Sequence, residues 1–153
     1  DIENEHHRRN IENTLQRLLD YDVVPIVNEN DTIATEEIQI GDNDTLSAIV
    51  ATLAKADRLI LLSDIEGLYD ANPKENPSAK LIPFVEEIDE SILALAGGAG
   101  SAFGTGGMQT KLRAGLLANG AGIPMIIMDG RCPELLYDAV EGRPVGTWFG
   151  KRS

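Results

Sequence analysis

The sequence predicts an α/β fold in which helices alternate with buried, mainly parallel strands. Three short apolar runs, at residues 23–27, 59–62 and 124–128, consist almost entirely of branched or long aliphatic side chains. Such runs are typical of strands that are buried on both faces of a sheet. A strand, a helix and a second strand within about forty residues indicate a right-handed crossover between parallel strands.

The helices between these runs are predicted from apolar residues at helical spacing. They fall at residues 11–19, 46–53, 91–96, 110–119 and from Pro133 onward. Asp44 or Thr45 can cap the second of these helices, because both side chains can accept a hydrogen bond from the first turn. Asn119 and Gly120 form a typical C-terminal stop for the fourth helix.

The remaining segments are predicted to be a strand, a hairpin and two loops. Residues 145–149 read as a terminal strand, and the alternation of apolar and polar residues over 32–40 indicates a hairpin or edge strand. Residues 70–83 contain three prolines and form a long surface loop. Residues 97–107 contain six glycines, which are too many for a regular element.

Composition excludes several classes of protein. The 153 residues include 13 Lys and Arg against 25 Asp and Glu, for a formal net charge of −12. This balance argues against nucleic-acid binding and against adsorption to an anionic membrane, since both need clustered positive charge. The single cysteine, Cys132, excludes an intrachain disulfide framework. No apolar run approaches the roughly 20 residues that cross a bilayer, so we expect no membrane partner. The lone cysteine fits a reducing cytoplasm, and the length of the chain fits one α/β domain.

Polar residues follow each predicted strand, at 28–31, 63–64 and 129–130, and a further polar cluster occupies 41–44. The carboxyl ends of parallel strands meet at one edge of a sheet, where α/β proteins bind ligands. The clusters could hold Mg²⁺ or the polar groups of a substrate. Alternatively, these residue types are common in turns, and the clusters are solvated surface.

The glycine-rich segment 104–111 is a second candidate binding element. Its glycines let backbone N–H groups approach a phosphate, and the following helix adds its positive N-terminal dipole, with Lys111 as a point charge. The segment is not a Walker A loop, because Leu112 follows Lys111 in place of Ser or Thr. A flexible loop ahead of a helix remains the alternative.

Four blocks in this order, at residues 24–31, 41–48, 63–73 and 104–111, resemble the amino acid kinase family, and most closely its members that phosphorylate glutamate. The resemblance implies a three-layer αβα sandwich with a mainly parallel central sheet. It also implies transfer of the ATP γ-phosphoryl group to the side-chain carboxylate of L-glutamate, which gives glutamyl 5-phosphate at the first step of proline biosynthesis.

The resemblance also implies roles for individual residues. Asp44 and Lys111 correspond to catalytic residues: Asp44 aligns the lysines around the transferring group, and Lys111 stabilises the transition state. Glutamate contacts are implied for Asn28, Asp31 and Asn43. Contacts with ATP are implied for Ser63, Asp64, Thr105, Gly106, Gly107, Met108, Gln109, Thr110 and Lys111. ATP and Mg²⁺ are the expected cofactors, with no residue assigned as a metal ligand. A homo-oligomer and feedback inhibition by proline are also expected.

The sequence departs from the family pattern at its start. The first strand, its glycine loop with a lysine, and a serine that contacts glutamate are absent, as is the RNA-binding-like PUA domain of many relatives. We therefore interpret residues 1–153 as one partial kinase domain that has little or no activity by itself. Two alternatives stay open: another family member, such as an acetylglutamate or carbamate kinase, and a non-catalytic regulatory module that binds an amino acid.

Overall fold

The computed structural model describes residues 2–28, 42–97 and 106–151, and its elements alternate between helices and strands. In chain order these are α1 (Ile2–Asp20), α2 (Asn43–Leu53), β1 (Leu59–Ser63), β2 (Phe84–Val85), α3 (Glu90–Leu95), α4 (Gly106–Gly120), β3 (Met125–Asp129), α5 (Leu135–Glu141) and β4 (Thr147–Phe149). No helix within these ranges is both long and apolar enough to cross a membrane.

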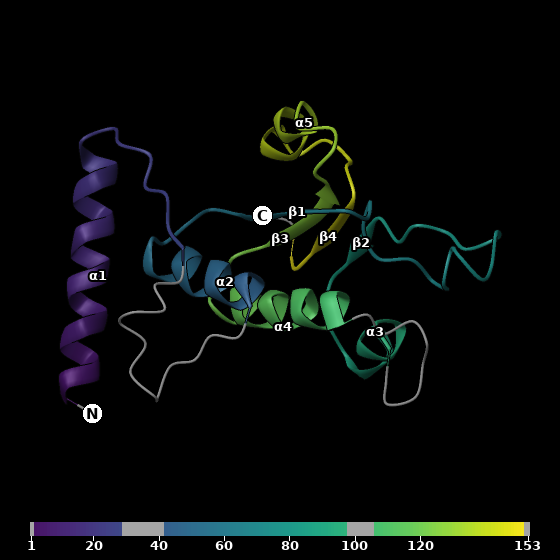
Figure 1. Cartoon of the computed structure of the whole chain (residues 1–153), viewed down its shortest axis with the longest axis horizontal. Coiled ribbons are helices and arrows are strands. Elements are labelled where there is room, and N and C mark those ends of the chain that lie inside the picture. The colour runs from purple at the N-terminus through teal and green to yellow at the C-terminus, as the bar shows by residue number, and fades with distance from the viewer. Residues whose placement is uncertain (1, 29–41, 98–105, 152–153) are drawn as a thin grey trace.

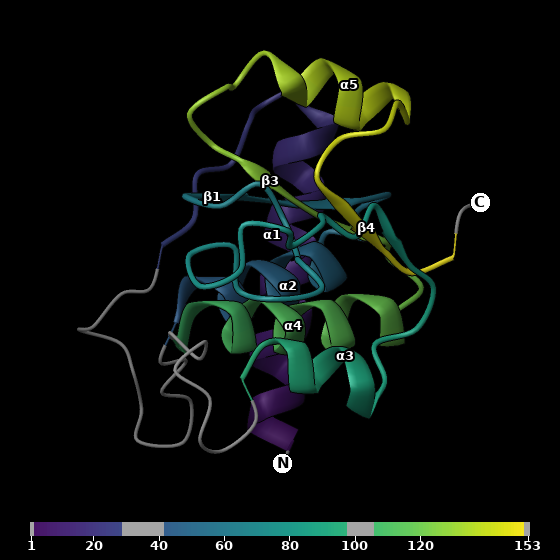
Figure 2. The ribbon, with the colours of Figure 1, turned by 90° about the vertical axis from the view of Figure 1, so that its right-hand side faces the viewer.

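The strands form one sheet in the order β1-β3-β4-β2. β1 and β3 are parallel, with Ser63 paired to Asp129 at their carboxyl ends. β2 and β4 are also parallel, whereas β3 and β4 are antiparallel. Helix α5 covers one face of the sheet, and α2 and α4 cover the other (Figure 1, Figure 2). The predicted three-layer αβα architecture with a mainly parallel sheet is therefore confirmed.

Strand β3 is buried on both faces, which accounts for the continuous apolar run at residues 124–128. Met125 and Ile127 point to the face covered by α2 and α4, where they join a core that includes Leu112. Ile126 and Met128 point to the opposite face and pack with Ala139 of α5. Because successive side chains of a strand alternate between its faces, a strand between two helical layers has to be apolar at every position.

The prediction of a strand at residues 23–27 was wrong, and with it the crossover from that segment to β1. These residues follow α1 without regular structure, and Val24 and Ile26 are 84% and 96% exposed. An apolar run predicts burial, but a strand also needs a hydrogen-bonded neighbour. Within the described ranges, β1 pairs only with β3, which the chain reaches through α4. The hairpin predicted over 32–40 lies outside the described residues.

Several boundaries also differ from prediction. The cap of α2 is Asp42, not Asp44 or Thr45: its backbone is extended, and its Oδ1 accepts a 2.7 Å hydrogen bond from the backbone N–H of Thr45. Helix α4 already begins at Gly106, inside the segment predicted to be irregular. Helix α1 extends to Ile2, and the two-residue strand β2 was not predicted because it is too short to show a pattern. The strands β1, β3 and β4, the helices α3 and α5, and the loop over 70–83 are confirmed.

Arg58 fixes α5 to the sheet. Its guanidinium donates hydrogen bonds to the carbonyls of Ala139 and Val140 in the last turn of α5, the second at 2.9 Å, and lies 4.8 Å from the ring centroid of Trp148 on β4. A cation in this position adds a donor to carbonyls in the last turn of the helix and complements the negative end of the helix dipole.

We expect Arg58→Ala to lower the free energy of unfolding by about 1.5–3 kcal/mol, because hydrogen bonds from a charged donor and the ring contact are lost together. Arg143→Ala is the matched control. Among the described residues its exposed guanidinium pairs only with Asp138 and Glu141 of α5, and such pairs contribute about 0.5 kcal/mol or less. Urea unfolding followed by circular dichroism measures both. Equal midpoints for the two variants would contradict this role of Arg58.

Candidate active site

Asp44 and Lys111, the two predicted catalytic residues, are in contact. Lys111 Nζ lies 3.1 Å from Asp44 Oδ2 and 3.4 Å from Oδ1. The side chains are 15% and 20% exposed respectively, so the pair is partly shielded yet reachable from solvent. The two residues are 67 positions apart in the chain and are brought together by α2 and α4, which lie side by side (Figure 1, Figure 2).

The first turn of α2 holds Asp44 in place. Asp42 caps this turn with both carboxylate oxygens, which accept from the backbone N–H and the hydroxyl of Thr45 at 2.7 Å and 2.9 Å. The hydroxyl of Ser47 donates to the backbone carbonyl of Asp44 at 2.6 Å. Asp44 thus lies in the first turn of a well-capped helix, where the dipole favours a negative charge.

Small residues let α2 and α4 pack against the sheet and each other. Ala48 and Ala51 of α2 and Ala114 and Ala118 of α4 are buried in one apolar cluster. Gly115 has the same role, since an added Cβ would lie 2.6 Å from Met125 Cε of β3 and 2.7 Å from Ile88 Cδ1. Close packing of the two helices brings Asp44 and Lys111 within hydrogen-bonding distance.

Thr110 makes a second contact between the helices. Its hydroxyl oxygen lies 2.7 Å from Asp44 Oδ2 and 2.9 Å from the backbone carbonyl of Gly107, one turn earlier in α4. Asp44 Oδ2 therefore accepts hydrogen bonds from both the hydroxyl of Thr110 and the ammonium of Lys111. The family resemblance implied that Asp44 aligns lysines such as Lys111, but nothing in the sequence indicated that Thr110 would also contact Asp44.

The carboxyl ends of β1 and β3 form the adjoining edge of the sheet. Ser63 ends β1, and its hydroxyl lies 3.2 Å from Asp64 Oδ1. Its backbone carbonyl accepts a 2.8 Å hydrogen bond from Gly130, directly after β3. Because α2 leads into β1 and α4 into β3, both helices run back along the sheet, and their N-termini point toward this same edge (Figure 1).

Asp129 and Arg131 form an ion pair at this edge that sequence analysis missed. Hydrogen bonds from the Arg131 side chain to both oxygens of Asp129, reinforced by the Arg131 backbone N–H, lower the pKa of Asp129 to about 2. Asp129 is therefore ionised at neutral pH, and its charge is balanced locally. The sequence signal was the polar pair of Asp129 and Gly130 at the end of β3, but it did not predict the contact with Arg131.

The other predicted residues occupy different surroundings. Asn43 is exposed at the first position of α2, and Asn28 is exposed at the end of the segment after α1. Met108 is buried in the core, and the side-chain amide of Gln109 donates to the backbone carbonyl of Gly97. Gly106 and Gly107 form the start of α4. Asp31 and Thr105 lie outside the described residues.

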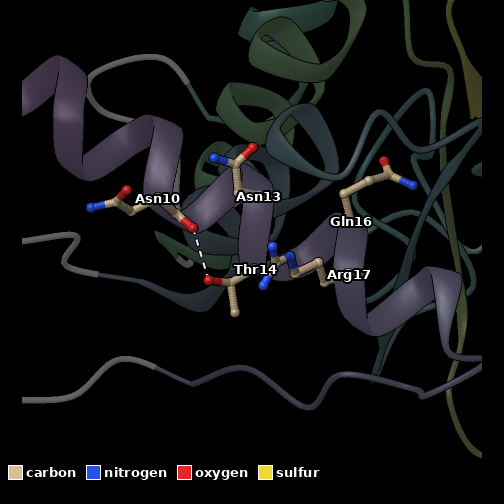
Figure 3. A pocket seen from close by; sticks show the side chains of 5 residues that line it. All are labelled: Asn10, Asn13, Thr14, Gln16 and Arg17. Carbon is tan, nitrogen blue, oxygen red and sulfur yellow. Dashed lines mark hydrogen bonds between the residues drawn. The ribbon is translucent and has the colours of Figure 1, made fainter.

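Two hollows near α1 lie apart from these residues. One, of about 550 Å³, is lined by five residues of α1 alone, namely Asn10, Asn13, Thr14, Gln16 and Arg17 (Figure 3). The other, of about 360 Å³, lies between α1 and residues 25–27. Neither is lined by a residue predicted to bind a substrate or ATP, so the candidate site rests on α2, α4 and the strand ends.

Comparison with known proteins gives one consistent family. The family model described as "Amino acid kinase family" matches residues 1–129. Glutamate 5-kinase of Clostridium tetani is 57% identical over 92% of this chain, and that of Photorhabdus laumondii is 52% identical over 97%. The matched regions make up 52% and 40% of those two proteins, so the chain spans about half or less of their length.

A solved structure supports the fold independently. The crystal structure of UMP kinase from Bacillus anthracis aligns with a TM-score of 0.66 over 94% of this chain and 52% of that protein, at 18% sequence identity. At this identity the likeness concerns the architecture alone.

Proposed function

Because this chain belongs to the amino acid kinase family, we propose that it provides the nucleotide-binding half, and part of the glutamate pocket, of a glutamate 5-kinase. The reaction is transfer of the γ-phosphoryl group of ATP to the side-chain carboxylate of L-glutamate, which forms glutamyl 5-phosphate. The observation that carries the proposal is the contact of Asp44 with Lys111, in a chain at least 52% identical to two glutamate 5-kinases.

The residues of the site suit this chemistry. A glutamate side chain, with an ordinary pKa near 4.3, is already ionised at neutral pH, so it attacks without a general base. The difficulty is to bring two anions together, and catalysis therefore rests on positioning and on neutralising charge. In a chain of net charge −12, Lys111 and the backbone N–H groups at the start of α4 are local sources of positive charge.

Within this proposal, Lys111 contacts the transferring phosphoryl group and Asp44 orients Lys111. Ser63, Asp64 and the glycine-rich segment contact ATP. Asn28, Asp31 and Asn43 contact glutamate. The residues form one partial kinase domain, and the active protein is a cytoplasmic homo-oligomer that proline inhibits.

Magnesium is the proposed metal and would neutralise charge on the phosphates. Within the described residues, no group of three or more His, Cys, Asp or Glu side chains could hold a metal ion. Mg²⁺ in kinases is commonly held by phosphate oxygens, waters and only one or two carboxylates, so this donor set is compatible with Mg²⁺ that enters bound to ATP. We assign no residue of this chain as its ligand.

A chimera tests the function directly. In it, these 153 residues replace the region of the C. tetani protein with which they align. We expect ADP release that depends on glutamate from the chimera and little or none from the chain alone, since the family's N-terminal lysine and glycine loop are not among its residues. A chimera that releases no ADP with glutamate would refute the proposal, and near-normal turnover by the chain alone would refute its expected inactivity.

ADP release and ligand binding, both measured on the same chimera, separate the alternatives. Release of ADP with N-acetylglutamate or carbamate, but not with glutamate, would assign the chain to another branch of the family. Binding of glutamate or proline without any ADP release would favour a regulatory module.

A further inference from the structure

We propose that Thr110 is a positioning residue, which holds the carboxylate of Asp44 in place and does not donate a hydrogen bond to the nucleotide. This inference rests on the proposed kinase function and deepens it. It revises the implied assignment of Thr110 to the ATP-binding set.

The hydroxyl of Thr110 has more acceptors within reach than protons to donate. A threonine hydroxyl donates one hydrogen bond. Thr110 Oγ1 already lies within reach of two acceptors, Asp44 Oδ2 at 2.7 Å and the carbonyl of Gly107 at 2.9 Å. The shorter contact is with a charged acceptor, and hydrogen bonds to ionised groups are the stronger ones.

A hydrogen bond from Thr110 to a phosphate would compete with its contact to Asp44. At neutral pH the inner oxygens of a triphosphate are acceptors, so Thr110 could bind them only by donating the proton that Asp44 receives. Releasing Asp44 would leave a carboxylate that is only 20% exposed with one fewer hydrogen bond, which is costly. The geometry therefore favours Asp44 as the lasting partner of this hydroxyl.

Lys111 shares its carboxylate partner with Thr110. Thr110 and Lys111 are neighbours in α4 and both contact Oδ2 of Asp44. When the ammonium of Lys111 turns toward a phosphoryl group, its bond to Asp44 weakens, and the hydroxyl of Thr110 remains to orient the carboxylate. Thr110 thus keeps Asp44 in position while Lys111 is engaged with substrate.

Kinetics of the chimera test this role. We expect Thr110→Val to lower kcat by about tenfold, as for the loss of a hydrogen bond to a charged group, with the KM for ATP changed by less than about twofold. Thr110→Ser, which keeps the hydroxyl, should restore kcat. A direct nucleotide contact predicts the opposite pattern: a KM for ATP raised by about tenfold with kcat little changed. That pattern, or an unchanged kcat, would overturn the inference.

Thr52→Val is the matched control. Thr52 is also a partly buried helical threonine, but its hydroxyl donates to Ala48 of its own helix at 2.9 Å. Loss of this hydroxyl should leave kcat and KM unchanged, which separates positioning of Asp44 from a general effect on helix packing.

A double-mutant cycle in the 153-residue chain tests the contact without relying on activity. Thr110→Val should lower the thermal midpoint when Asp44 is present and have little effect in the Asp44→Ala background, whereas Thr52→Val should act equally in both. Additive effects of Thr110→Val and Asp44→Ala would refute the inference. An inactive chimera with Thr110 intact would instead refute the proposed function, and the cycle would still decide whether the contact exists.

Discussion

Replacing Lys111 with alanine is expected to lower the kcat of the chimera by about 10²–10³-fold, the range seen when one preorganised group that stabilises a developing negative charge is removed. Lys111 is the only cation within 4 Å of Asp44 in the part of the chain that the structure describes, since Arg131 at the adjoining strand end pairs with Asp129 instead. Its loss therefore removes local positive charge where two anions must meet.

The experiment measures ADP release with saturating ATP and glutamate, after circular dichroism has shown that the variant is folded. Lys74→Ala is the control, because Lys74 is an exposed lysine of the 70–83 loop and should leave kcat unchanged. A Lys111→Ala variant that keeps kcat within about tenfold of the parent would contradict the assigned role.

The same variant separates a kinase from a regulatory module. A kinase would lose phosphoryl transfer, since Lys111 acts on charge that develops during the reaction. A module that only senses an amino acid would keep both its binding of that amino acid and its response. Isothermal titration calorimetry of the Lys111→Ala chimera with glutamate and with proline decides between these outcomes.

Gly146→Ala is expected to lower the free energy of unfolding by roughly 3–5 kcal/mol. Gly146 directly precedes β4 and has a φ of +58°. A Cβ atom there would lie 1.9 Å from the backbone oxygen of Ile127 in β3 and 2.9 Å from that of Glu66. Both neighbours are backbone atoms, which cannot move aside as a flexible side chain would.

Gly142→Ala provides the matched control. Gly142 caps α5 with a φ of +76°, but a Cβ there would have no atom within 4 Å. This substitution carries only the strain of a left-handed backbone, about 1 kcal/mol. Soluble yield and urea unfolding measure both variants, and equal unfolding midpoints would show that the close approach of β3 to Gly146 does not limit stability.

Short-range patterns in the sequence account for most of the fold. Strands β1 and β3 were predictable because a strand covered by helices on both faces has to be apolar at every position, as residues 59–62 and 124–128 are. Helix α4 was predictable from its apolar spacing, but its start was not, since Gly106 and Gly107 favour irregular structure and are helical only in the folded context.

The candidate site was predictable in composition but not in geometry. The polar cluster at 41–44 and the glycine-rich segment were predicted as candidate binding elements, and Asp44 and Lys111 were singled out from the family resemblance. Which of two neighbouring acids caps α2 and which faces α4 depends on the helix start: Asp42 has the extended backbone of a cap, so Asp44 is left to meet Lys111.

The sequence by itself determined the α/β class, the buried central strands and the residue types of the site, because periodicity and local propensity act over a few residues. Only the tertiary structure decided that Val24 and Ile26 are exposed, since a strand forms only where a neighbour offers hydrogen bonds. It alone also decided that Thr110 and Lys111 share one oxygen of Asp44, because that contact depends on how closely two distant helices pack.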